Sequence, residues 1–423
     1  MTAIRNGVPW YDTDGEVVNA HGVGVVAHDG RFYLFGEFKT DDRNVFAGFS
    51  CYSSTELAGW TFEGLALPPQ VDGLLGPDRV GERPKVLRSP VTGEFVLYAH
   101  ADDLAYADPH IIVATSASVT GPYVIVGPLM FEGRALRRWD MGTFEDDDGT
   151  AYLLTHEGDI FRLSDDRLTI DEQVAAAVAP GGESPAMFRS GGAYWLLVSN
   201  KTSWERNDNL VLSAPSPSGP WTPRGLLAPE GTLTHNSQCS FVLRLADGRH
   251  IYLGDRWSFP RQASAATQVW LPLNVDGGVA ALPEYLEAWT IDREETFRPV
   301  RTRTDVGFRA SREGEHVEVA FTGDGVEVVG RSAPDCSYGL IEVLRDAPRD
   351  DVPPGEVIVL SQIVDWYSLV PQRGTRWVSP PLPAGDYRIR ISATGERPEW
   401  RKKDGTRFGP TGSLVDVETI VTR

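Results

Sequence analysis

The sequence predicts an all-β protein, and three observations support that prediction. Glycine (43) and proline (30) are abundant among the 423 residues. Tryptophan (12) is frequent whereas methionine (4) is rare, and many aromatics beside many turn-forming residues favour short strands over helices. A glycine turn followed by an aromatic-rich strand also recurs five times between residues 30 and 257, which indicates a repeated β-sheet unit.

The five copies of this pattern define the order of the expected units. They read GRFYLFGE (30–37), GEFVLYAH (93–100), GTAYLLTH (149–156), GAYWLLVSN (192–200) and GRHIYLGDRW (248–257). The intervals between their starts leave room for about four short strands each. The pattern predicts a five-bladed β-propeller over residues 1–295, closed by pairing of residues 10–16 with residues 286–292. An array of β-sandwiches with accidental similarity is the alternative.

The pattern changes after residue 295, where apolar and polar residues alternate with period two. Segments 316–331, 355–368, 384–396 and 414–421 predict an antiparallel, jelly-roll-like β-sandwich over residues 296–423. We interpret this domain either as a carbohydrate-binding module or as a packing domain. In the first case Trp366, Tyr367 and Trp400 are the aromatic residues that would hold sugar.

Charge and cysteine usage narrow the classes of partner. Fifty-nine acidic residues against forty basic ones give a net charge of -19, which disfavours nucleic acids and anionic membranes as partners. The distant Cys51, Cys239 and Cys336 form neither a disulfide framework nor a zinc pattern, so we expect no metal and no cofactor. Because no apolar segment approaches about 18 residues and no signal peptide is visible, we expect a cytoplasmic location, or secretion if a leader was trimmed.

Polar residues precede each aromatic strand by a similar distance, and they form the predicted site. In a propeller the innermost strands line a central channel, so such residues converge from distant parts of the chain. The positions are Asn19 and His21, Glu82, Asp140, Glu183, and residues 235–238. Taken alone, each carboxylate could be a solvated loop charge or half of a salt bridge, and Arg83 and Lys85 are the expected partners of Glu82. Several carboxylates focused on one pocket suit glycoside hydrolysis.

Six short segments in this order resemble glycoside hydrolase family 43, and within it the exo-β-1,3-galactanase-like branch (subfamily 24-like). They are NAHG (19–22), ERPKV (82–86), DMGTFEDDDGTAYL (140–153), ESPAMF (183–188), NSQCSFV (236–242) and GDRW (254–257). The resemblance, which covers about residues 8–295, implies that Glu183 is the general acid, Asp140 tunes it and Glu82 binds substrate. The first unit lacks the Asp base of most of the family. The resemblance implies that Gln238 acts as base through its imidic acid form.

This chemistry makes two demands on the site. Glu183 has to be protonated near neutral pH, so burial and the charge of Asp140 must raise its pKa. In an inverting enzyme the acid and the base lie about 6.5–9.5 Å apart. Aromatic faces and polar groups then hold the sugar, and the further substrate-binding residues we expect are Asn19, His21, Tyr106, Trp139, Trp204, Asn236 and Trp257.

The favoured function is an inverting, exo-acting hydrolase that releases galactose from β-1,3-galactan or arabinogalactan-derived oligosaccharides. An α-L-arabinofuranosidase or galactofuranosidase is the alternative within the class, because the family that the sequence resembles often acts on furanosides. A non-catalytic carbohydrate-binding propeller is the alternative of another class, and the missing carboxylate of the first unit supports it. All three hypotheses imply an oligosaccharide or polysaccharide partner. They leave the oligomeric state of the protein open.

Overall fold

The computed structural model describes residues 3–201, 203–291, 302–346, 356–402 and 404–423, and strands dominate it. The all-β class is confirmed. In these ranges the helical segments are only short ones: α1 (Leu233–Asn236), α2 (Gln262–Ala265), and the 3₁₀ turns η1 (Gly73–Leu75) and η2 (His156–Gly158). None of the described helices is long and apolar enough to span a membrane.

The chain divides into two compact units. The first comprises residues 1–6, 11–257 and 268–295, and the second comprises residues 7–10, 258–267 and 296–423. The predicted boundary between residues 295 and 296 lies outside the described residues. Within the second unit, Ser258 Oγ lies 2.9 Å from the hydroxyl of Tyr338, so the segment 258–267 packs with residues far along the chain.

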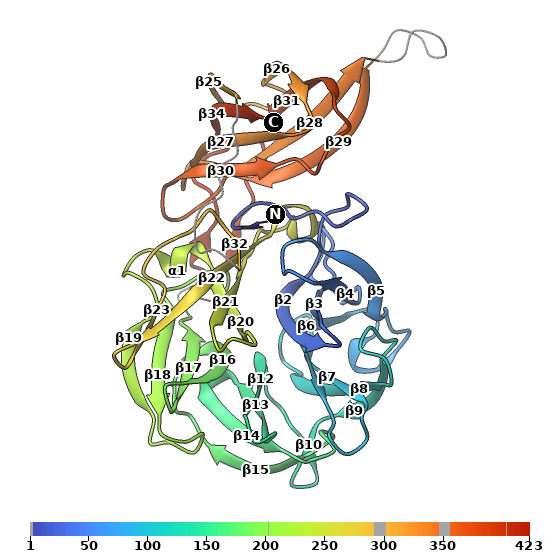
Figure 1. The fold of residues 1–423 in the computed structure, drawn as a ribbon, viewed down its shortest axis with the longest axis vertical. Coiled ribbons are helices and arrows are strands. Elements are labelled where there is room, and N and C mark those ends of the chain that lie inside the picture. The colour runs from blue at the N-terminus through green and yellow to red at the C-terminus, as the bar shows by residue number, and fades with distance from the viewer. Residues whose placement is uncertain (1–2, 202, 292–301, 347–355, 403) are drawn as a thin grey trace. The chain divides into compact units, whose positions relative to one another are not determined.

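Five four-stranded antiparallel sheets follow one another through the first unit (Figure 1). The first sheet contains β2 (His21–His28), β3 (Arg31–Glu37), β4 (Phe49–Ser54) and β5 (Thr61–Leu67). The second contains β6 (Arg79–Arg88), β7 (Phe95–Asp103), β8 (His110–Ser116) and β9 (Val124–Pro128). The third contains β12 (Met141–Glu145), β13 (Ala151–Thr155), β14 (Asp159–Leu163) and β15 (Ile170–Ala175).

The remaining two sheets have the same order of strands. The fourth contains β16 (Glu183–Ser190), β17 (Ala193–Ser199), β18 (Leu210–Ala214) and β19 (Thr222–Leu226). The fifth contains β20 (Gln238–Arg244), β21 (His250–Arg256), β22 (Thr267–Asp276) and β23 (Val279–Ala281). A short hairpin of β10 (Met130–Phe131) and β11 (Arg134–Ala135) lies between the second and third sheets in sequence.

The first strands of the five sheets are arranged in a ring. Each of β2, β6, β12 and β16 contacts the first strand of the next sheet, and β20 contacts β2 again. Figure 1 shows these strands on the inner side of their sheets. The approach is close: a Cβ atom added to Gly142 on β12 would lie 2.2 Å from the carbonyl oxygen of Pro185 on β16. Only glycine permits that distance.

Apolar side chains fill the space between successive sheets. Phe35, Phe49 and Leu97 belong to a buried cluster formed by the first and second sheets. Trp195 and Tyr252 belong to the corresponding cluster of the fourth and fifth sheets. All of these residues except Phe49 come from the recurring aromatic strands of the sequence. Burial of each large apolar side chain contributes about 1.5–3 kcal/mol, so the packing of sheet against sheet holds the ring rigid around its centre.

Contacts between the two ends of the first unit close the ring. Strand β1 (Ile4–Arg5) pairs with β24 (Ala288–Trp289). The predicted closing segment 286–292 contains the paired residues Ala288–Trp289, but their partner is Ile4–Arg5 and not the predicted residues 10–16. Trp60 before β5 packs edge to face on Trp270 of β22, with ring centroids 5.9 Å apart. The first and fifth sheets are thus joined by an apolar contact as well as by hydrogen bonds.

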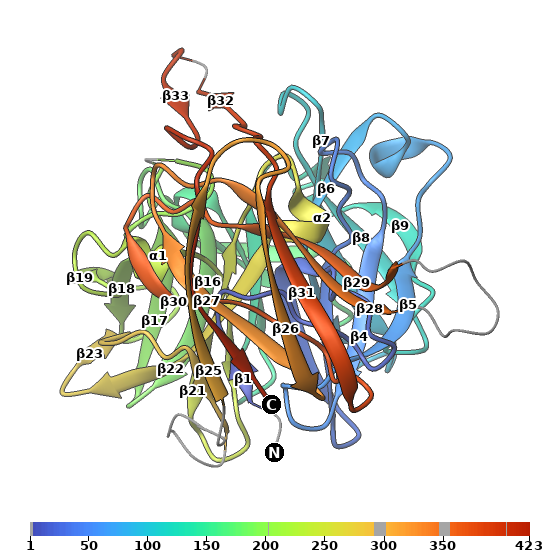
Figure 2. The ribbon, with the colours of Figure 1, turned by 90° about the horizontal axis from the view of Figure 1, so that it is seen from above.

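The second unit contains two four-stranded antiparallel sheets, which Figure 2 shows from above. One has the order β25 (Thr302–Ala310), β34 (Val415–Thr422), β27 (Val326–Ser332) and β30 (Gln372–Val378). The other has the order β26 (His316–Gly323), β31 (Gly385–Ala393), β28 (Tyr338–Asp346) and β29 (Glu356–Asp365). A short hairpin of β32 (Trp400–Arg401) and β33 (Arg407–Phe408) accompanies them. Trp366 and Tyr367 are buried, so the expectation that they could be exposed for sugar was wrong.

Candidate active site

Two of the predicted carboxylates, Glu82 and Glu183, stand at an irregularity that recurs in the first strands. The strand register shifts between the pairs His21/Gly24, Glu82/Lys85 and Glu183/Ala186. The residue after the first member of each pair has a left-handed backbone, with φ of 61° for Gly22, 55° for Arg83 and 54° for Ser184. Such a bulge re-aims side chains, and a non-glycine residue in this conformation costs about 1–3 kcal/mol. The repeated bulge therefore gives three sheets the same means of turning a polar side chain out of the regular pleat.

Glu183 begins β16, and its carboxyl group is partly exposed among polar neighbours. Gln238 Nε2 donates a hydrogen bond of 3.2 Å to Glu183 Oε1. Burial and then the negative charge of Asp140 raise the pKa of Glu183 to about 8, although the charges of Arg83 and Lys201 oppose them. The pKa is therefore shifted in the direction that a general acid needs.

Arg83 joins the other members of this cluster. Its Nε atom forms an ion pair with Asp140. Its Nη2 atom donates to Ser184 Oγ at 2.6 Å and to Gln238 Oε1 at 2.8 Å, while its backbone nitrogen donates to Glu37 Oε1 at 3.0 Å. A guanidinium group presents five donors in a fixed plane, so one side chain can orient several partners. Arg83 thus ties all five sheets together at the centre of the ring.

The predicted pairing of Arg83 and Lys85 with Glu82 was wrong. Arg83 is turned toward Asp140 by its left-handed backbone. Lys85 is fully buried, and its Nζ atom donates to the carbonyl oxygen of Gly22 at 2.8 Å. Neighbours in sequence thus point to different partners, because the bulge changes the face on which each side chain lies.

Gln238 begins β20, and its amide oxygen is fully used. Trp257 Nε1 donates to Oε1 at 2.9 Å, and Arg83 donates to the same atom. An amide oxygen has two lone pairs, so no acceptor capacity is left there. The expected acid–base separation of about 6.5–9.5 Å was wrong for this structure. Gln238 and Glu183 are in direct hydrogen-bond contact.

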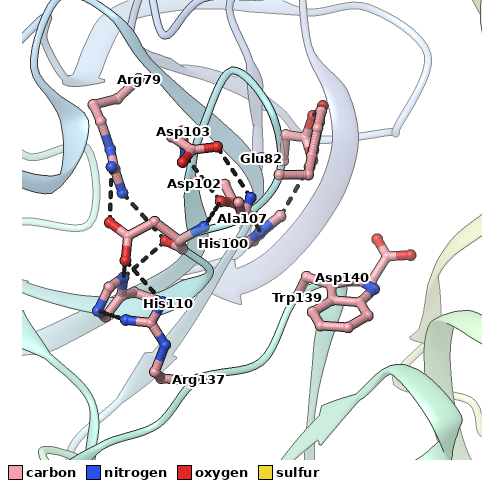
Figure 3. Close-up of polar contacts among 12 residues, drawn as sticks. Arg79, Glu82, His100, Asp102, Asp103, Ala107, His110, Arg137, Trp139 and Asp140 are labelled. Carbon is pink, nitrogen blue, oxygen red and sulfur yellow. Dashed lines mark hydrogen bonds and ion pairs between the residues drawn. The ribbon is translucent and has the colours of Figure 1, made fainter. Parts of the chain in front are cut away.

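Glu82, unlike Glu183, accepts hydrogen bonds from several donors. Tyr106 and Asn44 donate to its Oε1 atom at 2.7 Å and 3.2 Å. His100 Nδ1 lies 3.2 Å from its Oε2 atom, and Figure 3 shows His100 beside Glu82. Burial alone would raise the pKa of Glu82. The hydrogen bond from His100, the charge of Lys39 and the Tyr106 hydroxyl outweigh burial, so they lower the pKa far below its usual range. These partners therefore favour the ionised form of Glu82, which accepts hydrogen bonds.

Lys39 connects the carboxylate of Glu37 with that of Glu82, which it reaches through Asn44. Its Nζ atom lies 2.5 Å from Glu37 Oε2 and donates to Asn44 Oδ1 at 2.6 Å. Asn19 holds Lys39 by its backbone: Asn19 Nδ2 donates to the carbonyl oxygen at 2.8 Å, and the Lys39 nitrogen donates to Asn19 Oδ1 at 3.0 Å. Both polar ends of the Asn19 side chain are thus occupied inside the protein. The structure places Asn19 in support of Lys39.

Two other predicted residues, His21 and Asn236, are also buried, each with only 1% of its surface exposed. The ring of His21 lies 5.6 Å from that of Trp257. Asn236 Oδ1 accepts a hydrogen bond of 3.0 Å from Arg206. Both side chains are therefore withdrawn from solvent.

Three predicted aromatic residues are accessible: Tyr106, Trp139 and Trp204 are 44%, 40% and 38% exposed. Trp139 directly precedes Asp140 and stacks on His156, with ring centroids 3.7 Å apart. The ring of Trp204 lies 6.3 Å from that of Trp257. The site therefore combines buried polar groups with exposed flat apolar surfaces, which suits sugar rings. Among the described residues, no group of three or more His, Cys, Asp or Glu side chains is placed to hold a metal ion.

The sequence argument missed four residues of the site: Glu37, Lys39, His100 and Asp102. Glu37 and His100 each end one of the recurring aromatic strands, GRFYLFGE and GEFVLYAH. The same period that located the carboxylates could have located these two. Lys39 and Asp102 lie just beyond the ends of those copies and carry no comparable signal.

Comparisons with known proteins identify the family of this chain. Residues 23–229 match the family described as Glycosyl hydrolases family 43. A candidate exo-β-1,3-galactanase from Bifidobacterium bifidum s17 is 36% identical over 69% of this chain and 98% of its own, with a TM-score of 0.62. A comparison with curated protein sequences gives no match. The chain belongs to glycosyl hydrolases family 43, a family of glycoside hydrolases that act on carbohydrates.

Two further solved structures resemble the chain. The exo-β-1,3-galactanase Pc1,3Gal43A from Phanerochaete chrysosporium, solved with galactose, is 25% identical over 99% of each chain, with a TM-score of 0.70. A β-1,3-galactosidase of the same family, solved with galactodeoxynojirimycin, is 27% identical over 68% of this chain and 100% of its own, with a TM-score of 0.62.

Proposed function

We propose that this glycoside hydrolase is exo-acting and inverting, and that it releases galactose from β-1,3-galactan or arabinogalactan-derived oligosaccharides. One observation carries the proposal: Glu183 and Glu82 belong to one network at the centre of the ring, and their surroundings raise the pKa of the first and lower the pKa of the second. The relatives described as exo-β-1,3-galactanases and β-1,3-galactosidases support the sugar and the linkage. We also propose that the five-sheet ring is a five-bladed β-propeller and that the second unit is a jelly-roll-like sandwich. The cyclic contacts of the first strands support the propeller.

Glu183 is the general acid of this proposal. Its carboxyl proton passes to the glycosidic oxygen as the bond to the anomeric carbon breaks, so the leaving sugar departs as a neutral alcohol. The negative charge of Asp140 helps to keep that proton on Glu183 before the reaction. Arg83 holds Asp140 in place and limits how far the pKa rises, since its own charge acts on Glu183 in the opposite direction.

The other carboxylates of the site support inversion. Retention needs a second carboxylate as nucleophile about 5–5.5 Å from the acid. Asp140 is bound to Arg83 and accepts a hydrogen bond of 3.1 Å from the Ser184 nitrogen. Glu82 already accepts bonds from Tyr106, Asn44 and His100. Both are thus committed to positioning, and a water molecule is the better nucleophile.

Gln238 is the proposed partner of that water. Substrate has to separate Gln238 from Glu183, because their 3.2 Å contact leaves no space for a water between them. The imidic acid form would place a basic lone pair on Nε2. It would also place a hydrogen on Oε1, which now accepts two hydrogen bonds, so the bond from Arg83 or from Trp257 must then be given up.

The test is a substrate panel with product analysis. β-1,3-Galactobiose, nitrophenyl α-L-arabinofuranoside and nitrophenyl β-D-galactofuranoside are each incubated with wild type and with Glu183→Gln. We expect galactose from the first substrate, with the α anomer first in a proton NMR time course, and loss of that activity in the variant. Furanoside cleavage without galactose release would favour the furanosidase alternative. Sugar binding without hydrolysis by either protein would favour a binding module.

A further inference from the structure

His100 lies between two carboxylates at the floor of the site (Figure 3). Its Nδ1 atom is 3.2 Å from Glu82 Oε2, and its Nε2 atom is 3.1 Å from Asp102 Oδ2. The register explains both contacts: Glu82 on β6 is paired with His100 on β7, and Asp102 follows two residues later on the same face. All three side chains are largely withdrawn from solvent, with 2% of the His100 side chain exposed.

The geometry fixes the protonation of His100. Both ring nitrogens face carboxylate oxygens, which only accept hydrogen bonds, whereas a neutral imidazole donates from one nitrogen. The ring therefore carries a proton on both nitrogens. Burial opposes that charge, but the hydrogen bonds to Asp102 and Glu82, with the charges of Glu82 and Asp140, raise the pKa of His100 to about 9. The ring of Tyr106 lies 6.2 Å away on the remaining side.

Asp102 connects this histidine to the loop that carries Tyr106. Its Oδ1 atom accepts hydrogen bonds of 2.8 Å from the backbone nitrogens of Asp103 and Asp108. The loop 103–108 is thereby held at both ends, and it returns the Tyr106 hydroxyl to Glu82 Oε1 at 2.7 Å. The contacts form a closed cycle from Glu82 through His100 and Asp102 to Tyr106 and back to Glu82.

The contacts of the cycle and of Asn44 use three acceptor directions of the Glu82 carboxylate. A carboxylate offers about four lone-pair directions, two on each oxygen. Tyr106 and Asn44 occupy both directions on Oε1, and His100 occupies one on Oε2. No donor among the described residues uses the second acceptor direction on Oε2, which suits a single donor such as a sugar hydroxyl.

We propose that His100 is a positioning residue: doubly protonated between Glu82 and Asp102, it fixes the Glu82 carboxylate so that Oε2 accepts one hydroxyl of the bound galactose. This inference rests on the proposed function for the identity of the sugar. It assigns to His100 a share of the affinity for galactose, exerted through Glu82 and without contact with the reacting atoms.

The kinetic test compares two histidine variants. His100→Gln cannot donate to both carboxylates, so we expect KM for β-1,3-galactobiose to rise about tenfold to a hundredfold while kcat changes less than about threefold. His110→Gln is the matched control. His110 lies on the neighbouring strand β8 and contacts the Asp108 carbonyl oxygen at 2.9 Å and Arg137 at 3.2 Å, but has no described contact with Glu82. The control should keep the wild-type KM.

A double variant separates positioning from a general structural effect. In a Glu82→Gln background, His100→Gln should change KM by less than about twofold, because its route to the sugar is already broken. An equally large effect in that background, or an equal effect of His110→Gln, would overturn the proposal. Thermal unfolding of each variant shows whether the fold has survived.

A measurement on the wild-type protein is independent of catalysis. In the ¹⁵N NMR spectrum, both ring nitrogens of His100 should have the shifts of protonated nitrogens at pH 7 and lose them only near pH 9. A neutral ring at pH 7 would contradict the inference whatever the activity. If the doubly protonated ring is found but no galactoside is cleaved, the proposed function has failed and the arrangement around Glu82 has not.

Discussion

Glu183 and Glu82 are the same type of residue at equivalent bulges of two first strands, yet their pKa values are shifted in opposite directions. Burial acts on both in the same direction. Glu183 has Asp140 as its strongest charged neighbour and one hydrogen-bond donor, Gln238, and its pKa rises to about 8. Glu82 has donors from Tyr106, Asn44 and His100, and its pKa falls.

The comparison shows that hydrogen-bond donors and neighbouring charges, and not the extent of burial, determine the direction in which each pKa is shifted. A carboxyl group kept protonated can give a proton to a leaving group, whereas one kept ionised can only accept. Environments that push two similar pKa values apart identify the acid and its companion. Substitution of either glutamate, or of Asp140, should therefore change this difference in pKa in a way that can be measured.

The largest effect is expected from Glu183→Gln. An amide has no proton to give to the glycosidic oxygen, so kcat for β-1,3-galactobiose should fall on the order of 10²–10⁴-fold. A nitrophenyl galactoside needs less help from an acid and should lose less. Glu172→Gln on the outer strand β15 is the control and should retain activity. Equal activity of Glu183→Gln and the control would remove Glu183 from the mechanism.

Glu82→Gln should have a smaller effect of a different kind. The amide keeps the shape but offers an NH₂ group where a carboxylate oxygen now accepts from His100 or Tyr106. We expect KM to rise roughly tenfold to a hundredfold, with a smaller change in kcat. Steady-state kinetics on β-1,3-galactobiose measures both. A pure loss of kcat at unchanged KM would mean that Glu82 acts in the chemical step.

Asp140→Asn should reduce the difference in pKa between Glu183 and Glu82. Because the charge of Asp140 raises the pKa of Glu183, its removal lowers that pKa, and the charge of Arg83 then acts unopposed in the same direction. The alkaline limb of kcat/KM should move to lower pH. Above the limb, activity falls about tenfold for each unit by which the pKa drops. Asp148→Asn in the exposed turn after β12 is the control, and an identical limb in both variants would contradict this role.

The smallest effect is expected in stability. The folded state binds the Glu183 proton more tightly than the unfolded chain does, so this contribution is present below pH 4.5 and is lost as pH rises toward about 8. Glu183→Gln removes the group that must ionise while partly buried. The variant should therefore unfold a few degrees higher than wild type at pH 9, at about 2–4 °C per kcal/mol, and no higher at pH 4. Calorimetry at the two pH values measures the difference.

The sequence could predict the parts of this molecule that depend on local pattern. The glycine-plus-aromatic repeat located the five sheets, and the in-phase polar positions located Glu183, Gln238, Asp140 and Glu82. Both signals are local because each sheet repeats the same order of turn and strand. The same spacing also selected three residues that the structure buries: Asn19, His21 and Asn236.

The partners of each site residue could not be predicted, because they depend on backbone shape and on the closing of the ring. Arg83 follows Glu82 in sequence but bonds to Asp140, Ser184 and Gln238, 57 to 155 residues away. Its left-handed φ of 55° is what turns it there. For the same reason the low pKa of Glu82 could not be predicted from the sequence, because it depends on a cross-strand contact with His100.

The opposite protonation of the two glutamates is tested most directly by ¹³C NMR titration of the side-chain carboxyl groups, with Glu183→Gln and Glu82→Gln used to assign the signals. The Glu183 signal should titrate near pH 8, and the Glu82 signal should stay that of an ionised carboxylate throughout the pH range in which the fold is stable. Titration of both signals near the usual value for glutamate, about 4.3, would contradict the account.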